Sequence, residues 1–304
     1  MPFSIRRAAT VTAAAMLIFT AGAWASRKAT YIRPVMHTFS AAGIRQIVVQ
    51  NLAGPISVQT AAGNSIQVTI LIHSAGDDAV FARTLSQQLT FTVQNINGQL
   101  RVIGNYPLDH FRNYAYPMKS IAGIHGTDKN VYQGKKVFVR NVSSGKAVEL
   151  WAEIRITTPP RVAVVLRNIY GELKLRGGVP APGGGSMDGF TDAGNIEVYR
   201  PEWQSVKLQN DYGKVDFTAG LGAARDIHIK TDVGSTYLSL QPGADPVIIA
   251  HKDLGFLHND ITQASFHKDS QGDSVLKLGD GKGATVTIDM SIGSLHLATI
   301  GAGQ

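Results

Sequence analysis

Cysteine is absent from the 304 residues of this chain. Its absence excludes disulfide bonds, zinc sites built on cysteine, and attachment of a lipid to an N-terminal cysteine. Charged residues are also scarce, at 17% of the sequence, and the lysines and arginines are scattered along it. A nucleic-acid partner is therefore not expected, because binding to phosphates requires a basic patch.

Sequence signatures of catalysis are missing as well. The chain has no Gly-x-Ser-x-Gly elbow, no phosphate-binding loop and no His-Glu-x-x-His motif. Beyond residue 25, no apolar stretch reaches the roughly 20 residues that a membrane-spanning helix needs. We therefore assign no catalytic residue from the sequence and expect no transmembrane segment in the mature chain.

Residues 1–25 have the pattern of a secretory signal peptide. Arg6 and Arg7 precede the apolar run from 8 to 21, and Ala23-Trp24-Ala25 supplies the small residues of a cleavage site before Ser26. Export without disulfides suits a bacterial periplasmic or cell-surface protein. Removal of the segment lowers the net charge from +7 to +5, which indicates solubility rather than a particular partner.

Glycine is abundant, with 32 residues, and several glycines occupy the same place in a recurring pattern. The pattern reads apolar-x-apolar, a polar Asn, Thr or Asp pair, and then Gly-x-apolar-x-apolar. The motif glycines are Gly54, Gly171, Gly194, Gly213, Gly234, Gly255 and Gly293. From 171 to 255 they are separated by 23, 19, 21 and 21 residues, and a fixed period of this size is typical of a solenoid.

Apolar and polar residues alternate on both sides of each motif glycine. Leu173 and Leu175 follow Gly171 with Lys174 between them, and this period of two predicts strands. We expect the glycine to occupy a turn at positive φ and the preceding Asp or Asn to bond to the backbone of its own turn. The predicted fold is all-β: a single-stranded parallel β-helix, or β-solenoid, with irregular insertions.

Three regions follow from these patterns. They are the signal peptide at 1–25, an N-terminal β part of the solenoid at 26–160, and regular coils with a C-terminal cap at 161–304. The first β part is interrupted by a long aromatic and polar insert at 104–146. The coils are interrupted at 258–283, which predicts an insertion or a capping excursion before a final coil.

Local signals place further elements in the N-terminal part. Alternation predicts strands at 65–72 and 148–156, whereas 26–39 has no clear period. Asp77-Asp78 begins a stretch that is compatible with a short helix capped by aspartate and ending near Gln88. The segment Asn95-Ile96-Asn97-Gly98 predicts the turn of a β-hairpin.

Three stretches resemble the bacterial “putative adhesin” families of the DUF4097 type. They are VQNLAGPISV at 49–58, IRITTP at 154–159, and the serial glycine units that end in IGSLHL at 292–297. Each motif alone has low specificity, and the resemblance depends on their order and number along the mature chain. It implies a β-solenoid of unknown function at the cell envelope, with no catalytic residues to carry over.

Four aspartates stand two residues before a motif glycine. They are Asp192, Asp211, Asp232 and Asp253. Stacked coils would place them in one column with a spacing of about 4.8 Å, where carboxylates could hold Ca²⁺. Aspartate is also the ordinary residue for a turn that faces water, and on that interpretation no cofactor is required.

The 104–146 insert carries the other candidate binding residues. They are Tyr106, Phe111, Arg112, Tyr114, Tyr116 and His125. Aromatic rings with a neighbouring cation suit contacts with carbohydrate or protein. The same rings would also serve to cover an open end of the solenoid, where edges and core are exposed. The sequence leaves both roles open.

Two classes of function remain. The leading hypothesis is a non-enzymatic exported solenoid that presents an elongated surface for adhesion, or for binding an envelope protein or glycan. The alternative is a carbohydrate-active β-helix enzyme that uses the insert, with His125 and Asp109 as its most reactive-looking residues. A periplasmic structural component cannot be separated from the first by sequence, and the oligomeric state is not encoded in any motif.

Overall fold

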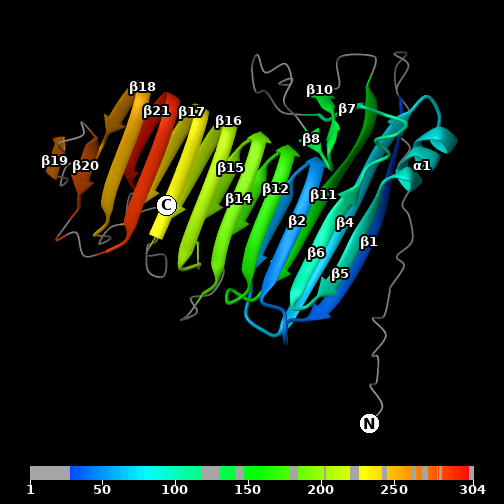
Figure 1. Cartoon of the computed structure of the whole chain (residues 1–304), viewed down its shortest axis with the longest axis horizontal. Helices are drawn as coiled ribbons and strands as arrows, with labels where there is room; N and C mark the ends of the chain where they lie inside the picture. Colours follow the sequence, from blue (N-terminus) through cyan, green and yellow to red (C-terminus); the bar gives the residue numbers. More distant parts are fainter. Residues whose placement is uncertain are drawn as a thin grey trace, which may run out of the picture.

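The structure is a computed structural model, and it describes residues 28–117, 131–140, 147–177, 184–201, 203–219, 226–241, 245–261, 265–268, 273–278, 280 and 283–300. The predicted signal peptide and His125 lie outside the described residues. Within them the chain is mostly β, with a large mixed sheet and one helix, α1 (Ala79–Gln88). Figure 1 shows the strands side by side along the long axis of the molecule.

Eleven strands of the described residues precede residue 160. They are β1 (Ala29–Ser40), β2 (Gln46–Ala53), β3 (Ile56–Thr60), β4 (Ser65–Gly76), β5 (Thr90–Ile96), β6 (Gln99–Asn105), β7 (Asn113–Ala115), β8 (Val131–Tyr132), β9 (Lys135–Lys136), β10 (Phe138–Arg140) and β11 (Val148–Thr158). The strands that follow are β12 (Ala163–Tyr170), β13 (Leu173–Arg176), β14 (Ser186–Ala193), β15 (Ile196–Tyr199), β16 (Ser205–Ala219), β17 (Asp226–Leu240), β18 (Val247–Asn259), β19 (Ser265–Lys268), β20 (Ser274–Lys277) and β21 (Thr285–Thr299).

The N-terminal end of the molecule is antiparallel. Strand β4 pairs with β1 on one side and β11 on the other, β5 and β6 form a hairpin, and α1 packs beside β1 and β4. Asp78 caps the helix, with its carboxylate accepting a hydrogen bond from the amide of Phe81 at 2.7 Å. The hairpin turns at Asn97 and Gly98, both at positive φ. The predicted strands, capped helix and turn are confirmed, whereas β1 falls where no period was visible.

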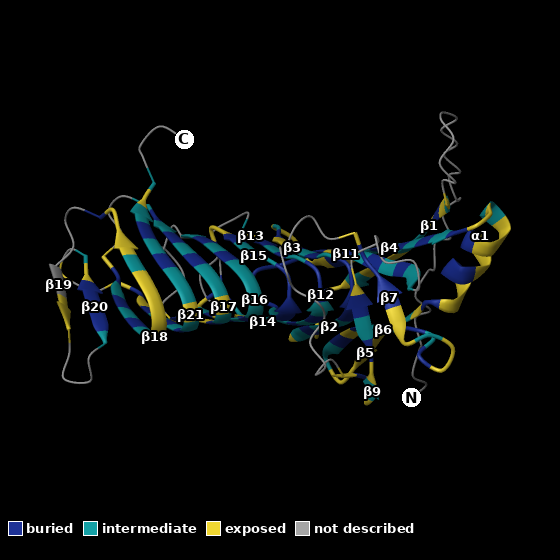
Figure 2. Ribbon diagram, turned by 90° about the horizontal axis from the view of Figure 1, so that it is seen from above, coloured by how far each residue is buried: buried dark blue, intermediate teal, exposed yellow. Residues whose placement is uncertain are grey.

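Beyond this end, successive layers are built from parallel strands in strict register, except that β20 pairs antiparallel with β18 and β19. One ladder runs β2–β12–β14–β16–β17–β21–β18, and a second runs β3–β13–β15 before joining the C-terminal halves of the long strands from β16 onward. Figure 2 shows the two ladders as two layers. Each chain segment crosses from the first layer to the second at its motif glycine.

The core lies between the two layers. Val164 and Leu166 point inward from the first layer, Leu173 and Leu175 point inward from the second, and all four are at most 1% exposed. The equivalent residues of neighbouring layers are buried in the same way, as the alternation predicts. Lys174 lies between two buried leucines and faces solvent, so the strand prediction also assigns the outer face correctly.

The motif glycines stack directly on one another, and this contact explains why they are glycine. A Cβ at Gly171 would lie 2.3 Å from the carbonyl oxygen of Gly54, and a Cβ at Gly213 would lie 2.0 Å from that of Gly194. The same contact repeats through the glycine column, which runs in space as Gly54, Gly171, Gly194, Gly213, Gly234, Gly293 and Gly255. Gly194 does not have the positive φ that we expected of every member, so close approach is the shared requirement.

Buried side chains bond across the layers beside this column. Asn168 Nδ2 donates to the carbonyl of Gly54 at 2.9 Å, and Asn210 Nδ2 donates to that of Gly194 at 3.0 Å. These residues are fully buried and stand three before the glycines of their own layers. The expected bond within the turn is present for Asn51, whose Nδ2 donates to the carbonyl of Ala53 at 3.0 Å, and Asn210 Nδ2 also reaches the carbonyl of Lys214 at 3.4 Å. The bond to the carbonyl of the previous layer is a further contact that the sequence did not predict.

The order of the last strands also differs from the sequence order. Strand β21 lies between β17 and β18 and pairs in parallel with both. The segment expected to be the final coil is therefore the penultimate layer, and β18 is the last. Strand β20 pairs antiparallel with β18 and with β19, so the interruption at 258–283 contributes strands at the end of the stack.

The glycine column predicts a position-specific cost of adding one methyl group. Gly213→Ala places Cβ against a backbone carbonyl at φ +140°, whereas Gly63→Ala, at φ +125°, meets nothing within 4 Å. A strained φ costs about 1–3 kcal/mol. We expect Gly63→Ala to lower the free energy of unfolding by about this much and Gly213→Ala to lower it clearly more. Urea unfolding of both variants measures the difference. Equal losses would show that the stacking contact is not the constraint.

Candidate functional site

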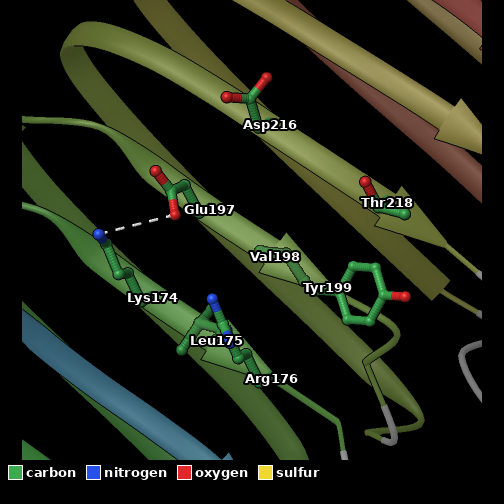
Figure 3. A pocket seen from close by; sticks show the side chains of 8 residues that line it. All are labelled: Lys174, Leu175, Arg176, Glu197, Val198, Tyr199, Asp216 and Thr218. Atoms are coloured by element: carbon green, nitrogen blue, oxygen red, sulfur yellow. Dashed lines mark ion pairs between the residues drawn. The ribbon is translucent and has the colours of Figure 1, made fainter. Parts of the chain in front are cut away.

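A shallow groove of about 340 Å³ lies on the outer face of the second layer. It is formed where β13, β15 and the C-terminal half of β16 run side by side (Figure 3). The lining residues are Lys174, Leu175, Arg176, Glu197, Val198, Tyr199, Asp216 and Thr218. Leu175 and Val198 are buried core residues, so the other six supply the groove's exposed side chains.

Parallel register aligns the exposed residues in two rows. Lys174 pairs with Glu197, which pairs with Asp216, so this row carries one positive charge followed by two negative ones. The second row places Tyr199 between Arg176 and Thr218. The pairing of neighbouring strands thus brings together side chains from three separate segments of the sequence.

Ion pairs organise the first row. Lys174 Nζ lies 2.8 Å from Glu172 Oε2 and 3.8 Å from Glu197 Oε2, and the hydrogen bond that Lys174 donates to Glu172 raises the pKa of Lys174. Asp216 pairs with Lys214 at 2.8 Å. These side chains are partly exposed, so the pairs contribute little to stability. Their effect is to hold donors and acceptors in place along the groove.

Tyr199 is the exposed aromatic side chain of the groove. The residue is 46% exposed, and the guanidinium of Arg200 lies 5.1 Å from the ring centroid. Arg200 has a φ of +47°, and its amide donates to the carbonyl of Thr218 at 2.8 Å. The left-handed backbone and this hydrogen bond fix the arginine beside the ring.

The outer row continues beyond the groove with aromatic residues. Lys214 Nζ lies 4.3 Å from the centroid of Tyr237, whose ring stacks on His296 at 4.5 Å with an interplanar angle of 4°. His258 follows at 5.7 Å from His296. The second layer therefore presents one unbroken strip of polar and aromatic side chains.

The tyrosines predicted as binding residues are core residues. Tyr106, Tyr114 and Tyr116 are 5%, 0% and 8% exposed, so the prediction of a binding role at these three positions is corrected by their burial. Phe111 packs partly buried against the core, and of the predicted binding residues that the structure describes, only Arg112 is exposed. The described part of the insert therefore covers the apolar interior, in agreement with the capping alternative.

Hydrogen bonds explain why residues 106 and 132 are tyrosines. The hydroxyl of Tyr106 donates to Asn51 Oδ1 at 2.9 Å and accepts from the amide of Ala53 at 3.3 Å. The hydroxyl of Tyr132 donates to the carbonyl of Gly104 at 2.6 Å. The rings of Tyr106, Tyr114 and Tyr132 meet edge to face. The insert is thus attached to the polar interior beside the glycine column.

The four aspartates do not form one continuous column. Asp192, Asp211 and Asp232 occupy successive layers, but β21 places Ser291 between Asp232 and Asp253. Asp232 lies 3.5 Å from Lys230, and Asp211 accepts a hydrogen bond from Gln209 at 3.0 Å. In the part of the chain that the structure describes, no three acidic or histidine side chains converge as a metal site.

Asp192 is buried, unlike a turn residue that faces water. It is 9% exposed, and burial raises its pKa from 3.8 to about 6, with a further contribution from Asp211. The carboxyl is therefore partly protonated in mildly acidic solution. Its surroundings are more apolar than the sequence indicated, because Ile169 occupies the matching position of the preceding strand.

Asp109 and the C-terminal histidines each have local partners. Asp109 is exposed and pairs with Lys135, while His251 and His258 pair with Asp273 and Asp260 at 2.7 and 3.0 Å. These are separate ion pairs on the surface. They offer no arrangement of a nucleophile with a general base among the described residues.

The sequence predicted no binding site at this place. Alternation marked Lys174 as an outward position between two core leucines, but Arg176 and Tyr199 were not singled out. They stand five residues after their motif glycines, at the next outward position of the strand. Counting one further alternation would have found them.

Comparisons with known proteins identify similar solved structures only. No family model matches the chain, and no curated protein matches it. Its structural neighbours are bacterial proteins described as “putative adhesins” or cell adhesion proteins.

The neighbours align over most of both chains. A “putative cell adhesion protein” from Clostridium sporogenes is 9% identical, with a TM-score of 0.45, covering 88% of this chain and 100% of its own. A “putative adhesin” from Bacteroides fragilis is 11% identical with a TM-score of 0.29, and the alignment covers 87% of this chain and 97% of that protein. A “putative lipid binding protein” from Parabacteroides distasonis is 10% identical with a TM-score of 0.29, and the alignment covers 88% of this chain and 96% of that protein.

The described residues contain one helix, and it is neither long nor apolar enough to cross a membrane.

Burial of Asp192 predicts a pH-dependent stability. Its pKa is raised on folding, so the folded state binds the proton more tightly and stability falls as pH rises from about 4 to about 6. Asp192→Asn should therefore stabilise the protein by about 1–2 kcal/mol at pH 7.5, with little effect at pH 4. Urea unfolding at both pH values measures this. Asp232→Asn, which removes only the contact with Lys230, is the control and should give no gain at pH 7.5.

The capping tyrosines predict unequal effects of removing a hydroxyl group. Tyr106→Phe leaves Asn51 Oδ1 without this buried donor and should cost about 1–3 kcal/mol. Tyr114→Phe should be neutral or stabilising, because its buried hydroxyl has no hydrogen-bond partner among the described residues. Thermal and urea unfolding of both variants provide the comparison. A larger loss for Tyr114→Phe would contradict this account of the cap.

Proposed function

We propose that this chain is an exported β-solenoid of the DUF4097 “putative adhesin” type that binds glycan at a bacterial envelope through its outer groove. The observation that carries the proposal is the paired rows of exposed side chains on β13, β15 and β16. A solenoid is supported by the parallel in-register layers and by the unbroken glycine column. Export is supported by the sequence of residues 1–25.

The chemistry of the groove suits a carbohydrate. Sugar hydroxyls both donate and accept hydrogen bonds, and the first row offers an ammonium donor at Lys174 and carboxylate acceptors at Glu197 and Asp216. The exposed ring of Tyr199 adds an apolar face beside them, which favours contact with the C–H groups of a sugar ring. The existing ion pairs hold these groups in place before a ligand arrives, which reduces the entropic cost of binding.

An elongated ligand fits this surface better than a small one. The groove is open and shallow, and the row continues through Tyr237 and His296 on the neighbouring layers. A polymer could make one weak contact per layer, and several such contacts would add up along the stack. Adhesion to a polysaccharide is therefore the function that the surface supports best.

Glycan-array binding of the purified mature protein tests the proposal. Tyr199→Ala should weaken binding by roughly threefold to tenfold, as expected for loss of one aromatic contact, and Glu197→Gln should also weaken it. The matched control is Lys207→Ala, which changes an exposed residue on the first layer. Equal binding by the wild type and both groove variants would reject this site.

Release of reducing sugars, measured on the same glycans, separates binding from hydrolysis. Binding without release supports adhesion. Release that is abolished by Asp109→Asn would instead support the carbohydrate-active enzyme that the sequence also allowed.

A further inference from the structure

Two arginines flank the exposed tyrosine of the outer groove. Arg176 pairs with Tyr199 in the parallel register of β13 and β15, and both side chains line the groove (Figure 3). The guanidinium of Arg200 lies 5.1 Å from the centroid of the Tyr199 ring. All three residues are exposed. The surface therefore brings two cations to one aromatic ring.

The two arginines extend from Tyr199 in opposite directions along the stack. Arg176 belongs to β13, in the layer before Tyr199. The side chain of Arg200 reaches Gln241, which directly follows β17, two layers after Tyr199. With the Gln241 amide turned so that its oxygen faces the arginine, that oxygen accepts hydrogen bonds from Nε and Nη2 of Arg200 at 3.1 and 3.2 Å. A ligand that runs along the stack therefore meets Arg176, Tyr199 and Arg200 in turn.

Among the described residues, no carboxylate forms an ion pair with either of these two arginines. The arginines of the described chain that do form ion pairs are Arg155 and Arg167. Gln241, the partner of Arg200, is an uncharged amide. The two positive charges beside Tyr199 are therefore available to a ligand.

The carboxylates of the groove are held by lysines along the first row. Lys174 lies within ion-pair distance of Glu172 and Glu197, and Lys214 lies within the same distance of Asp216. These side chains together carry two positive and three negative charges. Along each strand the first row stands two residues from the second, a separation of roughly 7 Å. The groove is thus divided into a slightly acidic row and a basic one.

We propose that the groove selects acidic polysaccharides, and that Arg176 and Arg200 bind the carboxylate or sulfate groups of sugars that pack against Tyr199. The proposal rests on the glycan-binding function proposed above and names the class of glycan. A guanidinium is a planar fork of N–H donors that matches two oxygens of such an anion at once. Gln241 uses Nε and Nη2 of Arg200 and leaves Nη1 for the ligand.

An acidic sugar uses both rows, whereas a neutral sugar uses only part of the site. The anionic group lies on the basic second row, and hydroxyl groups of the same sugars reach the lysine and carboxylates of the first row. The C–H face of a sugar ring covers the exposed ring of Tyr199. A neutral glycan makes the hydroxyl and ring contacts but gains no charge-assisted hydrogen bond from the two arginines.

Matched polymers test the class of glycan on the full mature chain. One pair is the polymer of galacturonic acid and its methyl ester, and the other is dextran sulfate and dextran. We expect about tenfold tighter binding to the acidic member of a pair, as one charge-assisted hydrogen-bonding contact supplies. The preference should shrink between about 0.1 M and 1 M salt, because the Debye length falls from about 10 Å to about 3 Å. The pair that shows the preference identifies the bound group, and equal binding within both pairs overturns the proposal.

Charge removal at the two arginines tests the site. Arg176→Gln and Arg200→Gln should each weaken binding of the preferred acidic polymer by about tenfold and leave binding of its neutral partner unchanged. The matched control is Lys207→Gln, which removes one positive charge from an exposed residue of the first layer. Equal weakening by this control would show that net charge attracts the polymer, and would overturn the proposal. Melting temperatures show that each variant folds.

The outcomes separate this proposal from the glycan-binding function on which it rests. If acidic and neutral glycans bind equally, lose affinity in Tyr199→Ala and are unaffected by the arginine variants, the groove binds glycan but the selectivity is wrong. If no glycan binds, both proposals fail. Poly-glutamate is the competitor that checks for an acidic peptide ligand. If it displaces the acidic polysaccharide at equal concentration of anionic groups, the arginines bind any polyanion and the selectivity for acidic sugars is overturned.

Discussion

The contact between a glycine Cα and the carbonyl oxygen of the glycine in the preceding layer is the constraint on which the structure depends. A Cβ would come within 1.6–2.3 Å of that oxygen at every layer from Gly171 onward. Only glycine allows two backbones to approach this closely. Because each layer is held at one point by this contact, its strands have no freedom to slip relative to their neighbours. A slip of one residue would also turn every core side chain outward.

Fixed register produces the continuous rows on both sides of each layer. Inward rows form the core between the two layers, and the buried amides of Asn168 and Asn210 bond from one layer to the carbonyl of the previous one. Outward rows bring Lys174, Glu197 and Asp216 together although they lie far apart along the chain. The same repeat that stabilises the molecule thus creates its surface. The two ends of the stack are the places where the repeat has to be interrupted.

The two ends of the stack are covered to different extents. At the N-terminal end, antiparallel strands, the helix α1 and the tyrosines around Tyr106 cover edges and core. At the other end, β21 fills the place between β17 and β18, and β20 covers only part of the last strand. The half of β18 that follows is left with exposed apolar side chains. The described second half of β18 is therefore less covered than the strands at the N-terminal end.

Short-range patterns were enough to predict much of the fold. The alternation around the motif glycines, the cap at Asp78 and the turn at Asn97 and Gly98 depend on residues only a few positions apart, and the structure has each of them. The strand at β1 was missed because its pairing with β4, rather than its own pattern, makes it a strand. The outward direction of Lys174 was predicted for the same reason as the core, since both follow from alternation, but the groove itself was not predicted.

The sequence by itself determined that the chain forms β-strands, which side chains face the core, and where each segment turns. Tertiary structure alone decided which strands are neighbours. The insertion of β21 before β18 separates Asp253 from the other aspartates, and burial converts the predicted binding tyrosines into a cap. The physical reason is that alternation and turn chemistry are local, whereas burial, stacking order and the position of an open edge depend on contacts between residues that are distant in the sequence.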